Sequence, residues 1–381
     1  MQINIVNNSG THASMDIYVC LLGQDTNGNY GYLELSPAGD TLSFTAATGT
    51  SETGAVTVPS YTLNEFSSMP DLSDYVNSGR GYVSINQTLD IPIWSSGYVG
   101  PAFMVDTNDT LFDFFEFFYD PSLDGMPNCN ADLSPLDWVS IPMSMQFDDA
   151  QGNPIAGPVG FDVKRYDLFY AFYTDAALKN LIVSSDNTGP VRILAPGHGI
   201  TNGLFSSSYL NDDIDAVWAH YAKKGNDLLL NASPVNNVVY SGQVVNDIFT
   251  FTDPTSGDTV SSISKPTTQD VLLCNGVFNG VGSGTDLLID ANIKNQVVSA
   301  LNRGILPLAG QQKLCDSSYF YATTQTNNGK FNTFSQLLHE NSFDGLCYGF
   351  AYDDQCDQST DVSVNNPVTL TVVILLFGEL E

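Results

Sequence analysis

The sequence predicts a mainly β protein with an added mixed α/β part, on three observations. Short apolar or alternating segments, separated by Gly, Pro, Asn and Asp clusters, fill about the first 155 residues and favour a β barrel or sandwich. Helical periodicity begins only near residue 161. The acidity is mostly Asp, accompanied by much Asn, Ser, Thr and Gly, which is a strand-and-loop composition. We therefore predict a β domain over 1–160 and a mixed α/β domain over 161–361.

The β domain is expected to consist of short strands. They are predicted at 3–8, 15–23, 30–36, 40–46, 55–63, 81–87, 89–94 and 102–106. The Gly- and Pro-rich segment 152–160 is the best domain boundary. The apolar run 369–377 is about half as long as a membrane-spanning helix requires. It is better interpreted as a buried strand, so the segment 362–381 is expected to return to a sheet.

The second part mixes helices and strands. Helical periodicity predicts helices at 166–182, 208–224, 288–304 and 331–343, the third ending at Gly304. Strands are predicted between them, at 191–196, 238–245, 247–253 and 270–276.

Charge restricts the partners. The net charge is −30, with 12 Lys and Arg against 42 Asp and Glu. Such a field repels nucleic acid and anionic membranes, so neither is expected as a partner. A neutral polysaccharide meets no such repulsion.

Six cysteines occur without a CxxC pair, which argues against a zinc ribbon. The even count is compatible with up to three disulfides, for which Cys274–Cys315 and Cys347–Cys356 are guesses, or with buried thiols throughout. The chain has no HExxH, no GxSxG and no P-loop, and we expect neither a metal nor a cofactor. Carboxylate chemistry is then the strongest enzymatic option.

Glu116 is the only glutamate between Glu65 and Glu340, and it lies in the aromatic segment LFDFFEFFYD. If the rings surround its carboxyl group, desolvation favours the protonated form that a general acid needs. Asp137 follows twenty-one residues later and is the candidate base. The alternative is that Glu116 points into solvent from an alternating strand while the Phe side chains fill a core.

Three further residues are candidates for a binding site. His198 lies between glycines that would let a ligand approach the backbone, or in a simple tight turn. Asp353 and Asp354 are expected to bind sugar hydroxyls or a cation, or to form an ordinary acidic loop.

Several collinear segments together resemble glycoside hydrolase family 64, the β-1,3-glucanases that release laminaripentaose. The matching segments are 4–10, 111–120, 137–143, 191–199, 207–221, 265–276, 300–304 and 339–354. The resemblance implies a thaumatin-like β barrel or sandwich joined to a mixed α/β domain, with a wide groove for glucan. It also implies an inverting carboxylate pair, with the general acid at Glu116 and the general base at Asp137; Asp132 is the less favoured substitute for the base.

The sequence departs from the family pattern after the acid. The run here is Phe118, Tyr119 and Asp120 instead of Thr, Tyr and Asn, and a longer segment, 124–135, follows. Tyr119 and Asp120 are still expected to contact substrate, while product length is not predicted.

The expected protein is therefore an extracellular, monomeric endo-β-1,3-glucanase that needs no cofactor. Met1 leads directly into a strand-and-turn pattern, so the chain would be cytoplasmic or would have lost a signal peptide. The alternatives are a non-catalytic glucan-binding module and a structural or defensive surface protein that shares the fold.

Overall fold

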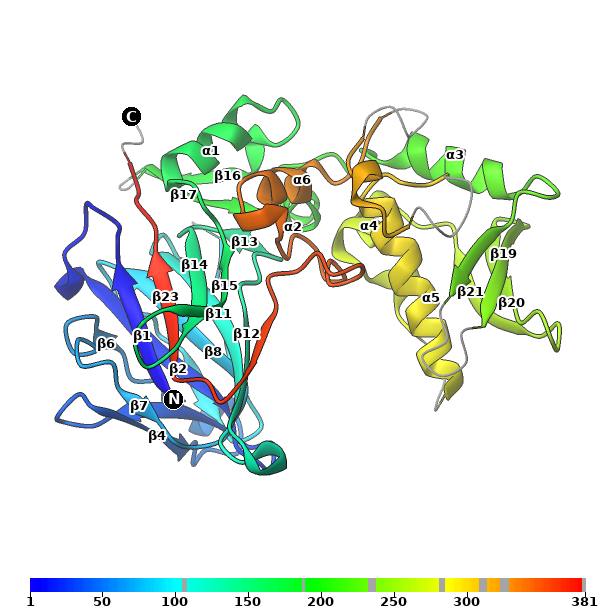
Figure 1. Cartoon of the computed structure of the whole chain (residues 1–381). Coiled ribbons are helices and arrows are strands. Elements are labelled where there is room, and N and C mark those ends of the chain that lie inside the picture. Colours follow the sequence, from blue (N-terminus) through cyan, green and yellow to red (C-terminus); the bar gives the residue numbers. More distant parts are fainter. Residues whose placement is uncertain are drawn as a thin grey trace. The chain divides into compact units, whose positions relative to one another are not determined.

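The computed structural model describes residues 1–104, 108–186, 189–231, 238–280, 285–307, 314–322 and 329–378 (Figure 1). The chain divides into two compact units. Unit 1 comprises Met1–Leu194, His339–Cys347 and Thr360–Glu381, and unit 2 comprises Ala195–Leu338 and Tyr348–Ser359. The strand expected at 102–106 lies partly outside the described residues, and its described part, 102–104, is not a strand.

Unit 1 extends well beyond the expected boundary at residue 160. Helix α1 (Arg165–Thr174) is tied to the β region because the Arg165 Nε donates to the Ser140 carbonyl oxygen at 2.6 Å. The Arg192 Nη2 likewise donates to the Thr110 carbonyl oxygen at 2.7 Å. Buried arginines that satisfy backbone carbonyls attach the segment 161–194 to unit 1.

One large sheet dominates unit 1. Its strand order is β15-β14-β23-β1-β7-β4-β3-β2-β8-β11-β12-β22, with β6 paired to β2. The terminal strands of this order, β15 and β22, contact each other, so the sheet nearly closes into a barrel. The strands are β1 (Gln2–Asn7), β2 (Ile17–Gln24), β3 (Tyr30–Leu35), β4 (Thr41–Ala46), β6 (Tyr61–Thr62), β7 (Asp71–Leu72), β8 (Val76–Ile85), β11 (Leu111–Asp120), β12 (Asn128–Asp132), β14 (Met143–Asp148), β15 (Pro154–Gly160), β22 (Val362–Asn365) and β23 (Thr369–Ile374).

Two small sheets complete unit 1. One has the order β10-β9-β5, from β5 (Val56–Thr57), β9 (Pro92–Trp94) and β10 (Gly97–Tyr98). The other has the order β13-β17-β16, from β13 (Trp138–Val139), β16 (Ile182–Ser185) and β17 (Gly189–Leu194). The apolar run near the C-terminus supplies β23, which pairs in parallel with β1 and antiparallel with β14.

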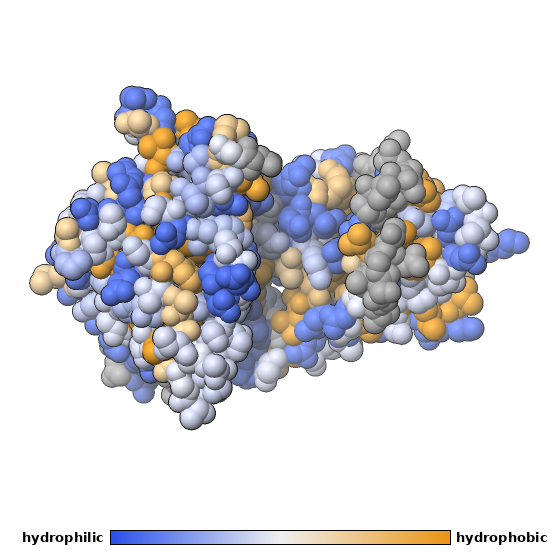
Figure 2. Space-filling view, turned by 90° about the horizontal axis from the view of Figure 1, so that it is seen from below, coloured by the Kyte–Doolittle hydropathy of each residue, from blue (hydrophilic) through white to orange (hydrophobic). Residues whose placement is uncertain are grey.

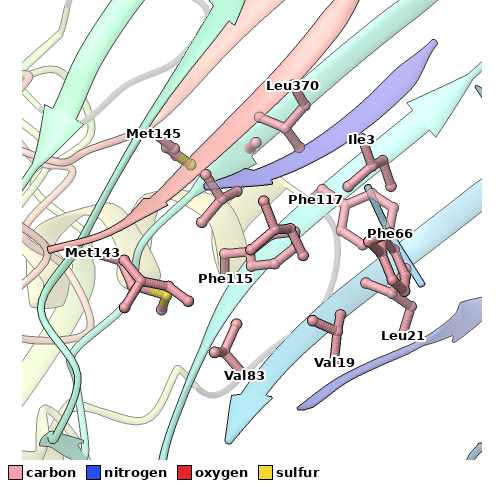
Figure 3. Packing of buried hydrophobic residues seen from close by; sticks show 14 of the residues in the cluster. Ile3, Val19, Leu21, Phe66, Val83, Phe115, Phe117, Met143, Met145 and Leu370 are labelled. Atoms are coloured by element: carbon pink, nitrogen blue, oxygen red, sulfur yellow. The ribbon is translucent and has the colours of Figure 1, made fainter. Parts of the chain in front are cut away.

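The core of unit 1 lies inside the large sheet. Phe115 and Phe117 of β11 point into it beside Leu21, Val83 and Met143 (Figure 3). Successive side chains of a strand point to opposite faces, so Glu116 between these two rings faces away from the core. The inward face of β11 therefore contributes Phe115 and Phe117 to the core, and the outward face carries Glu116.

Unit 2 has its own core, built on a four-stranded antiparallel sheet of order β18-β19-β20-β21. Helix α5 contacts β21, and Ser261 Oγ donates to Asp290 Oδ1 at 2.7 Å between these elements. The elements are β18 (Leu228–Asn231), β19 (Val239–Val245), β20 (Ile248–Thr252), β21 (Thr259–Ser264), α2 (Pro196–Thr201), α3 (Asn211–Tyr221), α4 (Thr268–Leu273) and α5 (Thr285–Asn302); α6 (Thr333–Glu340) begins in unit 2 and ends in unit 1.

The strand predicted at 270–276 is wrong, because its first half belongs to α4. Thr267 accepts a hydrogen bond from the Asp270 N–H, and the Asp270 side chain accepts one from the Thr267 N–H. This capping box starts a helix, and the apolar residues that follow form its buried face. A short apolar run does not by itself distinguish a strand from a buried helix.

The guessed disulfide pairs are also wrong. Cys315 is bonded to Cys356, both in unit 2, and the other four cysteines are buried and form no disulfide. Burial raises the pKa of Cys20 and of Cys274 to about 12, so these thiols remain protonated and unreactive.

In the part of the chain that the structure describes, no helix has the length and apolar character needed to cross a membrane. Hydrophilic and hydrophobic residues are interspersed on the face seen in Figure 2.

Candidate active site

The site is built on the outer face of β8, β11 and β12. Gly79 and Gly81 on β8 make room for the core rings of β11: a Cβ atom at Gly81 would lie 2.1 Å from the Phe115 ring, and one at Gly79 would lie 2.9 Å from the Phe117 ring. Arg80 between them therefore projects from the opposite face. There it is the direct cross-strand neighbour of Glu116.

Arg80 and Glu116 form an ion pair on this face. The Arg80 Nε donates to Glu116 Oε1 at 2.7 Å, and the two side chains are 33% and 31% exposed. The guanidinium also lies 4.6 Å from the centre of the Phe114 ring, a cation–π arrangement. The expectation that rings surround Glu116 is wrong, since Phe115 and Phe117 face the core and a cation lies against the carboxylate.

Asp132 on β12 is directly opposite Glu116 in the antiparallel register. Burial raises the pKa of Asp132 to about 7, and the negative charges of Glu116 and Asp361 act in the same direction. A hydrogen bond from Ser134 and the positive charge of Arg80 oppose that increase. The sequence predicts a desolvated carboxyl at Glu116, whereas the structure has one at Asp132, its cross-strand neighbour.

Asp137 is half-buried and comes directly before β13. The next residue, Trp138, packs on the outer face of β11, with its ring 5.3 Å from the Phe112 ring and 5.8 Å from the Phe114 ring. Its Nε1 donates to the Phe112 carbonyl oxygen at 3.4 Å. The apolar half of this face is thus covered by Trp138, and the chain at Asp137 is held beside the strand that carries Glu116.

Asp113 fixes the segment that follows Asp137. Its Oδ2 accepts hydrogen bonds from the Ser140 N–H at 2.8 Å and the Ile141 N–H at 3.1 Å. Burial raises the pKa of Asp113 to about 7, although these hydrogen bonds and Arg192 favour its charged form. Asp113 is fully enclosed, so its role is to position the segment.

A row of polar side chains continues along the outer face of β11, β12 and β22. Asn130 Nδ2 donates to Asp361 Oδ1 at 2.5 Å and to Ser363 Oγ at 2.9 Å. Asn128 Nδ2 donates to Asn365 Oδ1 at 3.0 Å. Amides and hydroxyls in such a row can exchange their hydrogen bonds for those of sugar hydroxyls.

The sequence reasoning missed Arg80 and this polar row. From the sequence, the segment 124–135 stands out only for its length, yet it contains β12. The available signal was the period-2 pattern of Asn128, Asn130 and Asp132, with Cys129 and Ala131 buried between them. An arginine between two glycines in a chain with only 12 basic residues was the signal for Arg80.

Alternation also separates the two residues expected to bind substrate after the acid. Tyr119 is 4% exposed and belongs to the core, so its predicted sugar contact is corrected to a packing role. Asp120 lies on the same face as Glu116, where its Oδ1 accepts from the Ser122 N–H at 2.8 Å. Phe118, which is half-buried, lies on this face between Glu116 and Asp120.

The other predicted residues lie in unit 2. His198 is half-buried within α2, which corrects the expected tight turn to a helical turn. Asp353 has no exposed surface and pairs with Arg303 at 2.8 Å, so its predicted sugar contact is corrected to a structural ion pair. Asp354 is exposed. Among the described residues of both units, no three His, Cys, Asp or Glu side chains are grouped to hold a metal ion.

Comparisons with known proteins identify the family and the fold. The sequence profile of a family described as Beta-1,3-glucanase (Glyco_hydro_64) matches residues 1–374. A glucan endo-1,3-beta-glucosidase of Cellulosimicrobium cellulans is 26% identical over 295 residues, which are 76% of this chain and 50% of that protein. The chain thus spans about half the length of the curated relatives it matches.

Two solved structures share the fold. A laminaripentaose-producing β-1,3-glucanase in complex with laminaritetraose superposes with a TM-score of 0.79 at 22% identity, covering 99% of both chains. A β-1,3-glucanase domain from Clostridium beijerinckii gives a TM-score of 0.75 at 24% identity, covering 98% of this chain and 97% of that one.

Proposed function

We propose that this chain, which belongs to glycoside hydrolase family 64, the β-1,3-glucanases, cleaves neutral β-1,3-glucan within the polymer by inversion and releases short oligosaccharides. The observation that carries the proposal is the family match over residues 1–374 together with the position of Glu116, the family's expected acid, on the open face of β11. The chain's net charge of −30 does not oppose an uncharged substrate.

In the proposed reaction, Glu116 gives its proton to the departing glycosidic oxygen as the bond from the anomeric carbon to that oxygen breaks. Asp137 removes a proton from the water that forms the new bond on the opposite face of the sugar. Inverting enzymes separate the two carboxyl groups by roughly 6.5–9.5 Å so that one water fits between them and the sugar. No cofactor takes part in this scheme.

Arg80 and Asp132 are the charged neighbours of the proposed acid. Arg80 lies against Glu116 at the 2.7 Å contact and would stabilise the negative charge that develops when the acid gives up its proton. Asp132, directly opposite Glu116 in the strand pair, would place a second carboxyl group beside it.

The polar row supplies the proposed binding contacts. Asn128, Asn130 and Asp120 would exchange hydrogen bonds with sugar hydroxyls, and Phe118 would offer a ring face to a pyranose. His198 and Asp354 remain proposed contacts from unit 2. We also propose that unit 1 is a thaumatin-like domain and that the protein is a monomer.

An extracellular location is proposed on chemical grounds. The Cys315–Cys356 disulfide is compatible with an oxidising compartment, and the polymeric substrate is found outside cells that consume it.

The test is product analysis with laminarin and curdlan. The protein should release oligosaccharides, and NMR of the first products should show the inverted anomer. Glu116→Gln should lower kcat about 10²–10⁴-fold while circular dichroism and glucan binding stay unchanged. Glu34→Gln, an exposed glutamate of β3 in the same sheet, is the matched control and should keep full activity. Full activity of Glu116→Gln would refute the assigned acid.

A non-catalytic glucan-binding protein is the second candidate, and the Arg80–Glu116 pair favours it. A carboxylate and a guanidinium held together on a partly exposed strand face offer hydrogen-bond acceptors and donors to sugar hydroxyls, which suits binding. Glucan retention without release of reducing ends by the wild-type protein would establish this alternative.

A further inference from the structure

Helix α1 carries three tyrosines that the proposed catalytic scheme does not use. Tyr166, Tyr170 and Tyr173 are spaced by four and three residues, so they share one face of the helix. Tyr170 is 54% exposed and Tyr173 is 67% exposed, whereas Phe169 and Phe172 are buried. A surface helix normally turns polar residues to this side, so packing does not explain the aromatic stripe.

Two of the three tyrosine rings are nearly parallel. Tyr166 and Tyr170 lie with centroids 6.0 Å apart and planes inclined by only 11°. Arg165 anchors the start of the helix, since its Nη2 donates to the carbonyl oxygens of Pro190 and Val191 at 2.8 and 2.9 Å. The Tyr166 N–H donates to the Phe377 carbonyl oxygen at 2.8 Å. The tyrosines therefore lie on a helix that is held in place, so little conformational entropy is lost when they bind a ligand.

The tyrosines line a pocket of about 440 Å³, within the size range of ligand sites. Its other lining residues are Phe169, Lys179, Ile182, Ser184 and Pro190. Among the residues that the structure describes, no carboxylate lines this pocket, in a chain with 42 acidic residues. Ring faces, hydroxyls and one ammonium group are the chemistry that recognises a polyhydroxylated, uncharged ligand.

We propose that this pocket is a second carbohydrate site that holds a β-1,3-glucan chain away from the carboxylates of β11, an inference that rests on the proposed function. The apolar C–H faces of pyranose rings carry partial positive charge and pack against the negative faces of aromatic rings. None of the lining residues belongs to the proposed catalytic face. A polymer bound here stays near the enzyme between cleavages, which raises its effective concentration at the catalytic carboxylates.

Other occupants fit the pocket less well. An anionic membrane surface would be repelled by a net charge of −30, and a single lysine does not offset that field. A protein partner would need a contact of roughly 1,200–2,000 Å² in total, whereas the exposed aromatic residues here are Tyr170 and Tyr173 of one helix. A neutral glucan chain requires only a few stacked rings.

The experiment uses the full chain with Tyr170→Ala and Tyr173→Ala combined, and the Tyr170→Phe, Tyr173→Phe pair as the matched control that keeps both ring faces. Affinity electrophoresis in laminarin gels, with Glu116→Gln in every variant to prevent cleavage, should show about tenfold weaker retention for the Ala pair. The Phe pair should migrate like its parent. In the active background, the Ala pair should lose activity on curdlan and keep kcat/KM on laminarihexaose.

Equal retention of the Ala pair and its parent would overturn the proposal, as would tighter retention of the parent by mannan or xylan gels than by laminarin. The proposed function fails separately: a wild-type protein that releases no sugar, but whose retention still depends on the two rings, would keep this site and discard the hydrolase.

Discussion

Glu116 and Asp132 are direct partners in the antiparallel pair of β11 and β12, on the face that points away from the core. Such cross-strand neighbours hold their Cβ atoms about 4.5–5.5 Å apart. That is shorter than the roughly 6.5–9.5 Å between the carboxyl groups of inverting glycosidases. Glu116 therefore lies close enough to raise the pKa of Asp132, and Asp137 is kept as the proposed base.

Replacing each aspartate in turn separates these roles. Asp137→Asn should lower kcat on laminarin about 10²–10⁴-fold, because nothing else would then accept the proton of the attacking water. Asp132→Asn should keep most of the activity at its optimum and change the shape of the pH profile, since the charge beside Glu116 no longer varies. If Asp132→Asn were inactive and Asp137→Asn active, the two assignments would have to be exchanged.

The raised pKa of Asp132 also predicts how stability depends on pH. A carboxyl whose pKa is near 7 in the folded protein and near 4 when unfolded binds more protons when folded. Its contribution to the free energy of unfolding is therefore fully present below about pH 4 and is lost as pH rises from about 4 to 7. Asp132→Asn removes this loss while its amide oxygen can still accept the Ser134 hydrogen bond.

Urea unfolding at pH 5 and at pH 8 tests this expectation. The free energy of unfolding of Asp132→Asn minus that of wild type should be larger at pH 8 than at pH 5. Asp90→Asn, at an exposed position of the same unit, should show no such change between the two pH values. An identical pH dependence of wild type and Asp132→Asn would mean that Asp132 is charged in the folded protein at both.

The alternation of LFDFFEFFYD could be recognised from the sequence, and so could Glu116 as an acidic residue that faces away from Phe115 and Phe117. What surrounds Glu116 could not be recognised, because Arg80 and Asp132 come from other strands and are brought there by register alone. A register shift of one residue would have placed both in the core. The predicted sugar contact of Tyr119 is wrong because Tyr119 lies on the inward face of β11, next to outward-facing Asp120.

The division into two units could be predicted only where it depends on local patterns. Periodicity located most helices and strands of unit 2, because each pattern is local. The first segment of unit 1 extends to Leu194 because Arg165 and Arg192 donate hydrogen bonds to backbone carbonyls distant in the sequence. No local sequence pattern predicts such contacts. The failure at 270–276 came from an overlooked local signal, the capping box of Thr267 and Asp270.

Gly81 is predicted to be essential for the packing behind Glu116. In Gly81→Ala the new methyl group would lie 2.1 Å from the fully buried Phe115 ring, so either the ring or β8 must move. Overpacking of this kind costs about 1–3 kcal/mol of unfolding free energy. Gly54→Ala is the matched control, because its nearest neighbour would be 3.6 Å away. Equal urea midpoints for the two variants would contradict this account of the glycine.

The Cys315–Cys356 disulfide should contribute to the stability of unit 2. It joins residues 41 positions apart, and a cross-link of that span removes about 4 kcal/mol of conformational freedom from the unfolded chain in the loop-entropy treatment. The double variant Cys315→Ser, Cys356→Ser should lose stability of that order in urea, and reductant should then have no further effect on it. Wild type should fall to the same midpoint when reduced. A wild-type midpoint that is insensitive to reductant would show that the cross-link does not stabilise this unit, and would remove the disulfide from the case for an oxidising compartment.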